Sequence, residues 1–385
     1  MDIAYLDNNA TTQPAPEVVA AMMPYLHDLY GNPSSVHRLG QRSRQAIDEA
    51  RAKIATLVGC AESELLFTGG GTESINTAIR AILTTRSPRK KIVTTTVEHS
   101  ATRELCQQLG REGFEIVEVP VNRDGQIDRD RFNLALADDN VALATMMYAN
   151  NETGVIFPVD WASEICKTYK VPFHCDATQA IGKLPVNFHD DAFDAASFAS
   201  HKFHGPKGVG ALFIRKGLRF RPLLIGGPQE RGRRGGTENV PGIVGMGRAA
   251  ELARDALSQM PRVAAMRDRL QQEILSRVDD SHVIGTTDSG ARLPNTTNIG
   301  FARLEAEAIL LLLSEKAICA SAGAACSSGS LEPSHVLRAM GIAETIAHGA
   351  VRFSLSRYTT DAEIDRCVEI LPPVIQRLRA VLPVS

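Results

Sequence analysis

Lys202 is the side chain whose surroundings point most directly to covalent chemistry. It lies between an apolar run and a Gly-Pro turn, and His201 and His204 flank it. A lysine held in a partly desolvated cleft near other cations has a lowered pKa and can form a Schiff base with a carbonyl compound. The alternative is a solvated loop lysine, and Lys207 is a rival in the same segment. Spacing alone does not separate Lys202 from Lys207.

A glycine run opens a helical stretch in the segment Phe67-Thr-Gly-Gly-Gly-Thr-Glu-Ser74. Bare backbone N–H groups and the positive end of a helix dipole suit a phosphate group. The hydroxyl of Thr72 adds a donor. By itself the segment is better explained as a tight turn with a threonine cap, and it matches neither the Walker nor the Rossmann pattern.

Two further polar residues follow β-rich runs. Asp176 stands just past a short apolar strand, where its carboxylate could pair with a protonated ring nitrogen, although capping the next helix is the commoner role. His99 could stack on a ring cofactor, although a lone histidine is more often structural. Together with Lys202 and the glycine run, these residues would provide a Schiff-base lysine, a phosphate site, a partner for a ring nitrogen and a stacking ring. A pyridoxal-phosphate site requires these four features.

Cys326 lies in Ser321-Ala-Gly-Ala-Ala-Cys-Ser-Ser-Gly-Ser330, among small residues that cannot bury it. We expect an exposed, mobile loop, the setting of a reactive thiol, although a chance surface cysteine is the alternative. The chain has seven cysteines, no CxxC pair and no metal-site spacing, which argues against a disulfide framework. Packing in helical, strand-like or apolar segments explains most of the others: Cys106, Cys166, Cys175, Cys319 and Cys367.

The elements that position these residues alternate from about residue 60 to 215. We predict strands at 91–97, 141–147, 172–175 and 209–214, with helices such as 101–112 and 161–170 between them. This alternation indicates an α/β fold with a parallel or mixed sheet covered on both faces, whose ligand crevice lies at the carboxyl ends of the strands. Residues 241–277 are expected to form one or two long helices. A smaller α/β part follows, with an apolar helix at 306–313 and a last helix from residue 361.

Length and charge limit the class of protein. A chain of 385 residues is expected to form two domains that share a cleft. The formal net charge of −2 gives no reason to expect nucleic acid or a membrane as the main partner, and the basic cluster at 231–234 is short. No apolar run approaches the ~20 residues of a membrane span, and the N-terminus lacks signal-peptide features. We therefore expect a cytoplasmic protein.

Ten short motifs follow one another along the chain: Tyr5-Leu-Asp-Asn-Asn-Ala-Thr-Thr12, Gly31-Asn-Pro-Ser-Ser35, Val97-Glu-His99, Ala149-Asn-Asn-Glu152, Asp176-Ala-Thr-Gln179, His201-Lys202, Gly205-Pro-Lys-Gly208, Gly235-Gly-Thr-Glu-Asn239, Cys326 with Ser330-Leu-Glu-Pro-Ser-His335, and Val351-Arg-Phe-Ser-Leu355. Together they resemble the cysteine desulfurases, which are fold-type I pyridoxal-phosphate transferases of the class V aminotransferase family. The resemblance runs from Tyr5 to about Asp365, and chance agreement over so many motifs is implausible.

The resemblance also indicates a branch of the family. The long small-residue loop around Cys326 is similar to the branch that serves iron–sulfur cluster assembly, and differs from the short-loop branch that resembles selenocysteine lyase. Segments 229–239 and 348–358 look closer to the nitrogenase-associated enzyme of nitrogen fixation than to the housekeeping one.

The resemblance implies a role for each site residue. Lys202 would carry the cofactor, and Arg352 would bind the substrate carboxylate through its planar fork. The cofactor's ring would contact His99, which also shuttles protons, Asn151, which also lies near the substrate, Asp176 at the pyridine nitrogen and Gln179 at the phenolic oxygen. Its phosphate would contact Gly71, Thr72, Ser200, His201 and Thr237 of the partner subunit. Ala199 stands where many relatives carry a phosphate-binding serine, which puts one hydroxyl contact in doubt.

The implied protein is a homodimer with two domains in each subunit. A large mixed-sheet α/β/α domain would span 13–250, and a smaller α/β domain would combine 1–12 with 251–385 and carry the cysteine loop at about 320–331. L-cysteine would become L-alanine while its sulfur passes to Cys326 as a persulfide, and then to an iron–sulfur scaffold or another acceptor protein. A metal, iron, would meet Cys326 only transiently, through a persulfide shared with that scaffold.

Two other classes of function remain open from the sequence. A selenocysteine lyase or class V aminotransferase on the same fold would need Lys202 but no exposed Cys326. A non-catalytic sulfur carrier or scaffold protein would not need the complete set of cofactor residues.

Overall fold

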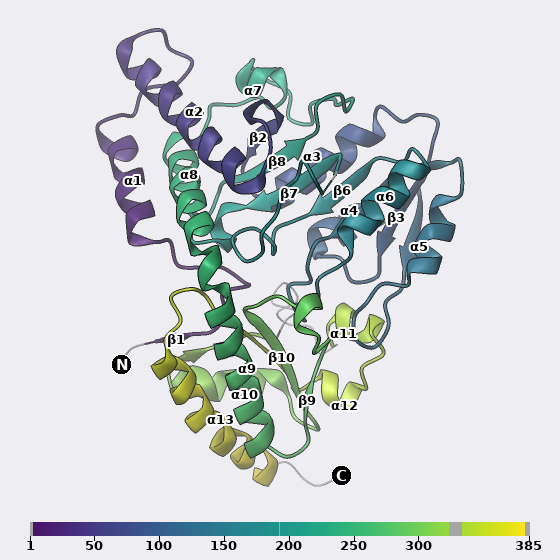
Figure 1. The fold of residues 1–385 in the computed structure, drawn as a ribbon, viewed down its shortest axis with the longest axis vertical. Helices are drawn as coiled ribbons and strands as arrows, with labels where there is room; N and C mark the ends of the chain where they lie inside the picture. Colours follow the sequence, from purple (N-terminus) through teal and green to yellow (C-terminus); the bar gives the residue numbers. More distant parts are fainter. Residues whose placement is uncertain (1–2, 192, 323–332, 382–385) are drawn as a thin grey trace.

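The computed structural model describes residues 3–191, 193–322 and 333–381. Its main feature is a seven-stranded mixed sheet in the order β2-β8-β7-β6-β5-β3-β4 (Figure 1). Neighbouring strands are parallel from β7 to β4, whereas β8 runs antiparallel to both β7 and β2. The strands are β2 (Leu65–Thr68), β3 (Lys91–Thr95), β4 (Glu115–Val119), β5 (Val141–Met147), β6 (Phe173–Asp176), β7 (Ala195–Ala199) and β8 (Gly210–Ile214).

Helices cover both faces of this sheet, which confirms the α/β expectation. One face packs against α3 (Gly71–Leu83) and α4 (Ser100–Arg111), with Leu66 and Leu212 in that core. The other face packs against the remaining helices of this part, with Leu65 and Phe213 in its core. Those helices are α1 (Pro16–His27), α2 (Arg38–Val58), α5 (Arg129–Leu136), α6 (Val159–Thr168) and α8 (Val240–Asp255). Strands β5 to β8 are buried along their whole length, as a sheet covered on both faces requires.

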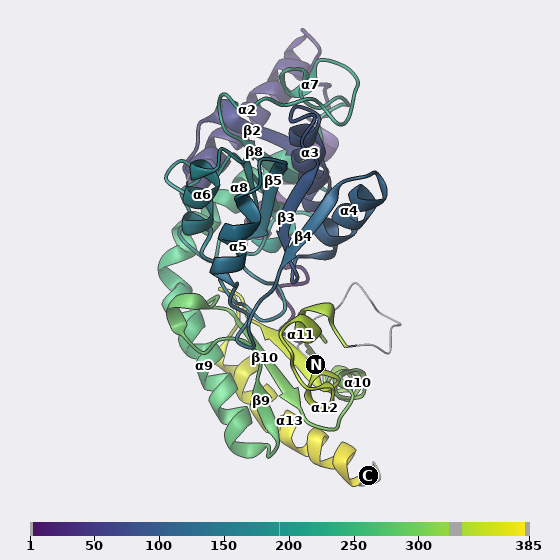
Figure 2. The same cartoon turned by 90° about the vertical axis from the view of Figure 1, so that its right-hand side faces the viewer.

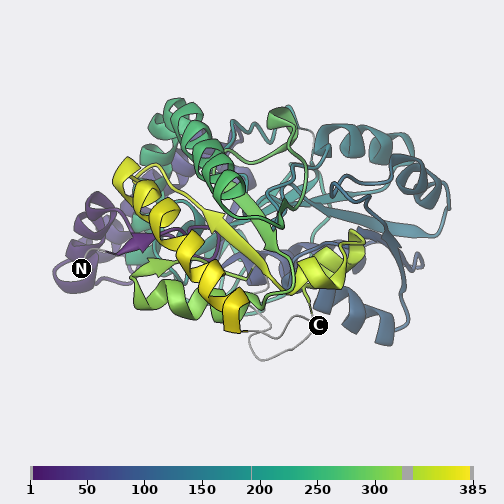
Figure 3. The same ribbon diagram turned by 90° about the horizontal axis from the view of Figure 1, so that it is seen from below.

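A smaller body lies below the sheet in Figure 1 and therefore in front of it in Figure 3, which is seen from below. Three antiparallel strands in the order β12-β10-β9 face a core of apolar side chains from three helices. Its elements are β9 (Ser281–Val283), β10 (Thr296–Phe301), β12 (Ala350–Ser354), α9 (Met260–Arg277), α10 (Ala306–Glu315) and α13 (Asp361–Val381). The short helices of the chain are α7 (Gln229–Gly232), α11 (His335–Ala339) and α12 (Glu344–Ala347).

The N-terminus joins this smaller body. Strand β1 (Ala4–Tyr5) pairs in parallel with β11 (Ile318–Cys319), and Leu6 is buried in the same core. The connecting helices α8 and α9 run from the large sheet down along the smaller body (Figure 2). The N-terminal strand thus packs with residues of 251–385, as the proposed division into 1–12 plus 251–385 and 13–250 requires. The core of the large sheet nevertheless crosses that boundary, because it also contains apolar side chains from the second range: Ala253, Ile284, Val336, Leu337, Met340, Ala347 and Ala350.

The predicted elements agree with the observed ones to within two residues, and only their ends differ. The strand expected at 141–147 has those bounds, whereas the strand expected at 91–97 ends at Thr95. The long helical region divides into α8 and α9 at a 3₁₀ turn, Ala256–Gln259. Within the described ranges, no helix is both long and apolar enough to cross a lipid bilayer.

Candidate active site

A cavity of about 540 Å³ lies at the carboxyl edge of the large sheet and is lined by nine of the predicted site residues together with Ala199. Strand ends and helix starts converge there, as expected for an open α/β sheet. The nine residues come from segments spread between positions 71 and 352 of the chain: Gly71, Thr72, His99, Asn151, Asp176, Gln179, His201, Lys202 and Arg352. The fold therefore brings together most of the side chains that the sequence singled out.

Lys202 ends a 3₁₀ turn, Ser200–Lys202, directly after strand β7. Its Nζ donates hydrogen bonds to the backbone carbonyl oxygens of Asn9 and Ala10, each at 2.8 Å. The rival Lys207 does not line the main cavity and instead lines a neighbouring one of about 490 Å³ at the glycine turn. This placement favours Lys202 as the covalent lysine, because only Lys202 shares the main cavity with Asp176 and His99.

Asp176 and His99 each accept a hydrogen bond from a backbone N–H two residues further on, and both also line the cavity. The helix cap that was the alternative role of Asp176 is not formed, because turns and no helix follow it. The Oδ1 of Asp176 accepts the backbone N–H of Thr178 at 3.0 Å, and the residue is 5% exposed. His99 is the N-cap of α4, where its Nδ1 accepts the N–H of Ala101 at 3.1 Å. This bond leaves Nε2 to carry the proton of the neutral ring. Burial lowers the pKa of His99; the charge of Asp176 opposes this effect, and Lys202 adds a smaller lowering.

The glycine turn forms the N-terminus of α3. Gly70 adopts φ of 152°, a conformation that L side chains rarely adopt, and a Cβ there would meet no atom within 4 Å. Gly71 and Thr72 begin the helix and line both cavities. Exposed N–H groups at a helix start, beside His201, make this end of the cavity suitable for an anion.

His201 and Ser200, which are both predicted to contact the phosphate, lie differently relative to the two cavities. His201 lines both cavities, and its Nδ1 contacts the hydroxyl of Thr11 at 3.1 Å. Burial and the neighbouring charge of Lys202 lower the pKa of His201 to about 4, so its ring is neutral. Ser200 is fully buried, does not line either cavity and has its Oγ where a side chain on Gly205 would stand. The geometry therefore does not support a Ser200–phosphate contact, and the methyl group of Ala199 faces the cavity in its place.

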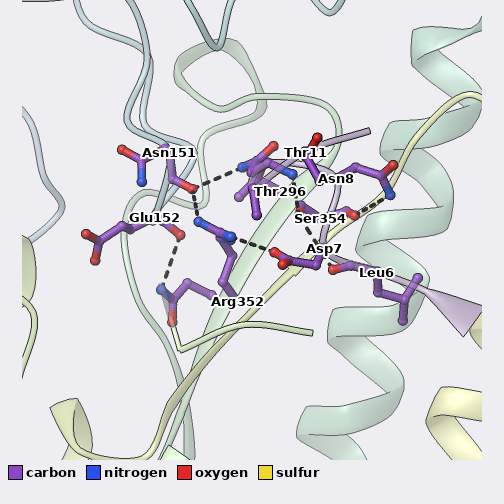
Figure 4. A network of polar contacts seen from close by, with 12 residues as sticks. Leu6, Asp7, Asn8, Thr11, Asn151, Glu152, Thr296, Arg352 and Ser354 are labelled. Atoms are coloured by element: carbon purple, nitrogen blue, oxygen red, sulfur yellow. Dashed lines mark hydrogen bonds and ion pairs between the residues drawn. The ribbon is translucent and has the colours of Figure 1, made fainter. Parts of the chain in front are cut away.

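Arg352 projects from β12 and is 1% exposed (Figure 4). Its Nη2 donates to Oδ1 of Asp7 at 2.6 Å, and its Nη1 donates to the backbone carbonyl of Asn151 at 2.9 Å. The guanidinium thus joins the N-terminal segment, the loop after β5 and the small sheet. Arg357, a second buried arginine five positions further along the chain, does not line this cavity.

Sequence reasoning missed the part played by the segment from Asp7 to Ala10. Asn9 is 1% exposed; its amide donates to Thr296 Oγ1 at 2.9 Å, and its Oδ1 accepts from Asn295 at 3.0 Å. The motif Tyr5-Leu-Asp-Asn-Asn-Ala-Thr-Thr12 was visible in the sequence, but a backbone carbonyl has no residue type that could reveal its role.

A buried carboxyl group next to His99 was also missed. Glu98 is 1% exposed, and its Oε1 accepts bonds from Thr95 Oγ1 at 2.7 Å and from the N–H of Met147 at 3.1 Å. Burial raises the pKa of Glu98 to about 8. The carboxyl is therefore protonated at neutral pH.

Besides Ser200, Thr237 is a predicted site residue that does not line the cavity. Thr237 is exposed, on a segment held by the buried ion pair Arg51–Glu230 at 2.6 Å and by the pair Arg234–Glu73 at 2.9 Å. Cys326 lies outside the described residues. The six cysteines that are described all have thiol pKa values raised by burial: Cys60, Cys106, Cys166, Cys175, Cys319 and Cys367.

Comparison with known proteins gives the same family over nearly the whole chain. Residues 4–367 match the family model described as aminotransferase class-V. The chain is 52% identical to cysteine desulfurase 2 of Trichormus variabilis, over 100% of this chain and 96% of the relative. It is 49% identical to the cysteine desulfurase NifS of Azotobacter vinelandii, over 98% of this chain and 94% of the relative. A solved NifS-like protein superimposes with a TM-score of 0.91 at 38% identity, over 98% of this chain and 100% of that one.

Proposed function

This chain belongs to the class V aminotransferase family, and from that premise we propose that it is a pyridoxal-phosphate-dependent cysteine desulfurase, a sulfurtransferase. The observation that carries the proposal is the single cavity that unites Lys202, Asp176 and His99 with Arg352. Relatives named cysteine desulfurase match the chain over its full length, and they do not favour a selenocysteine lyase, an aminotransferase or a non-catalytic scaffold.

The residues present fit the cofactor. The amine of Lys202 would hold it covalently, and the glycine turn with Thr72 and His201 would hold its phosphate. Asp176, a buried carboxylate at a strand end, would keep the pyridine nitrogen protonated, and the ring of His99 would lie against the cofactor. When bound, the cofactor withdraws electrons from the Cα of the substrate.

The chain's own residues would perform the remaining steps. Arg352 would orient the cysteine carboxylate, and its contact with Asn151 fixes the direction of the guanidinium. Lys202 would move the proton at Cα. The thiolate of Cys326 would attack the substrate sulfur, so that one S–S bond forms and the C–S bond breaks. Protonation of the carbon then gives L-alanine, and Cys326 carries the persulfide.

The assignment of the sulfur to Cys326 is supported by the state of the other thiols. A thiolate is the nucleophilic form, and burial raises the pKa of each of the six described cysteines. Cys319, seven positions before Cys326, is in strand β11, and burial and the charge of Asp7 raise its pKa. None of these thiols lines the main cavity.

The Cys326→Ala variant tests this function. We expect it to fold, to bind pyridoxal phosphate and to show the cysteine-induced change in cofactor absorption, because none of these steps uses the thiol. Alanine and sulfide production should collapse, and mass spectrometry after a cysteine pulse should find no added sulfur. Cys319→Ala is the matched control and should remain active. Near-normal release of alanine by Cys326→Ala would replace the persulfide route with direct loss of sulfur from the substrate.

We further propose a homodimer in which Thr237 of the partner subunit completes each phosphate site. Exposed apolar side chains on α1 and at positions 224–225 support this proposal, because a monomer would leave them in contact with water. They are Val19, Met23, Leu26, Leu224 and Ile225. Light scattering at assay concentration should give twice the chain mass. A fully active monomer would contradict the proposal.

The destination of the sulfur is proposed on family resemblance. The persulfide would pass to an iron–sulfur scaffold or another acceptor protein, with iron meeting Cys326 only transiently, and nitrogenase assembly is the favoured setting because of the relative from Azotobacter vinelandii. Free cysteines suit a reducing cytoplasm. A scaffold protein incubated with this enzyme, cysteine and ferrous iron should gain cluster absorption, and Cys326→Ala should abolish the gain.

A further inference from the structure

Lys183 is a buried lysine that the proposed chemistry does not use. It is 7% exposed and stands one turn after Gln179, beyond Gly182, in the series of turns that follows strand β6. Its Nζ donates to the side-chain oxygen Oε1 of Gln179 and, at 3.2 Å, to Oδ1 of Asn9. A buried amine without such partners would be costly, so these contacts define what the side chain does.

The two ends of the Gln179 amide have different partners. Oε1 faces the Lys183 amine, and Nε2 donates to the backbone carbonyl of Asn9 at 3.0 Å. An ammonium group only donates hydrogen bonds, and a carbonyl only accepts them. A flipped amide would place NH₂ against the ammonium and oxygen against the carbonyl. The Lys183 amine and the Asn9 carbonyl therefore favour the same orientation of the Gln179 amide.

Protonation of Lys183 does not reverse this preference. Burial lowers the pKa of Lys183 well below its usual value, and Lys202 and Arg352 lower it further. A neutral amine still donates to Oε1, while the carbonyl of Asn9 continues to require Nε2 on its side. Asn9 itself is held by Thr296 and Asn295.

We propose that Lys183 is a positioning residue: it orients the Gln179 amide so that N–H, and not C=O, is presented to the phenolic oxygen of the cofactor. This inference rests on the proposed function. Gln179 lines the cavity, and its NH₂ has two hydrogens, of which the Asn9 carbonyl takes one. In this orientation the second hydrogen of the NH₂ group is available to the phenolic oxygen of the cofactor. In the flipped amide, Oε1 of Gln179 would face that phenolic oxygen, which carries negative charge.

Binding of pyridoxal phosphate to the apoenzyme tests the role of Lys183. Lys183→Met keeps the buried chain length but has no donor for Oε1. We expect its affinity for pyridoxal phosphate to fall about fivefold, the size of one lost hydrogen bond, with a changed visible absorption of the bound cofactor. Lys183→Gln retains an N–H donor and should restore most of the affinity. Lys53→Met, a half-exposed lysine paired with Glu251, is the matched control and should bind as the wild type does.

A double-mutant cycle separates positioning from a direct effect of charge. If Lys183 acts through the amide, Gln179→Leu should lower affinity by a similar factor, and adding Lys183→Met to it should change little. Additive losses, or wild-type affinity and absorption in Lys183→Met, would overturn the inference. Should Lys183→Met fail to fold, weakened binding by a folded Lys183→Gln would overturn it equally. Failure of the wild-type chain to bind the cofactor or to form alanine would instead reject the proposed function.

Discussion

The cavity has two walls of different construction. The sheet wall is made of side chains that follow strands, with His99 after β3, Asp176 at the end of β6 and Lys202 after β7. The opposite wall is formed by the N-terminal segment and β12, and it contributes backbone carbonyls and the Asp7–Arg352 ion pair. The sheet wall thus carries the groups that we propose to react, and the opposite wall supplies hydrogen-bond acceptors to Lys202 and a partner to Arg352.

Bonds between the walls explain why both are needed. The amine of Lys202 is held only 2.8 Å from carbonyls of Asn9 and Ala10, residues almost two hundred positions away in the sequence. A partly buried amine needs such acceptors, because a desolvated polar group without partners is costly. The comparison teaches that changes on the sheet wall should affect chemistry, whereas changes on the opposite wall should affect binding and orientation.

Removal of Lys202, the proposed covalent lysine, should have the largest effect. We expect Lys202→Ala to lower kcat by at least about 10²–10⁴-fold, because the variant loses the group that moves the Cα proton. Borohydride reduction of the wild type followed by peptide mapping should place the cofactor on Lys202. A label on Lys207 would show that the sheet wall has been assigned to the wrong lysine.

The buried carboxyl of Glu98 should make the sheet wall sensitive to pH. Its pKa is raised from 4.5 to about 8, so the folded state binds more protons than the unfolded state between these values, and stability falls as pH rises through this range. Relative to Glu98→Gln, the free energy of unfolding of the wild type should fall by up to about 1.4 kcal/mol per pH unit between pH 5 and 8. Denaturant titrations of both proteins at pH 5.5 and 7.5 measure this difference, and parallel behaviour would mean that Glu98 is ionised throughout.

On the opposite wall, Arg352→Lys keeps the charge but loses the planar fork. A charged hydrogen bond contributes about 1.5–3 kcal/mol, so KM for cysteine should rise about tenfold or more, with a smaller change in kcat. Steady-state kinetics provide the measurement. An unchanged KM would move the carboxylate site elsewhere, with Arg357 the first residue to replace.

The smallest effect is expected for Asp7. Asp7→Asn keeps an oxygen acceptor for Arg352 but removes a negative charge that competes with the substrate carboxylate. Because the Asp7 side chain is partly exposed, we expect KM to fall only about twofold. Arg269→Gln, which breaks a surface pair with Asp365, is the control for a general effect of charge and should leave KM unchanged. A rise in KM would mean that Asp7 mainly orients Arg352.

The sequence by itself determined the sheet wall. Apolar runs predicted the strands, and parallel strands place their carboxyl ends at one edge, so Asp176 and Lys202 had to lie near one another. Family motifs extended this to Arg352 and Gln179, whose contacts no periodicity could reveal. The structure places these four residues in one cavity, and their roles there remain predictions.

Only the tertiary structure decided the opposite wall. The carbonyls of Asn9 and Ala10 are common to every residue type, so no pattern in the sequence marks them as partners of Lys202. The sequence also does not show in which direction a side chain points. Ser200 and Ala199 are neighbours in the chain, yet the buried hydroxyl of Ser200 packs beside Gly205 and the methyl group of Ala199 faces the cavity. Lys183 looked like any other lysine until the fold buried it against Gln179, because the cost of burying an amine depends on long-range packing.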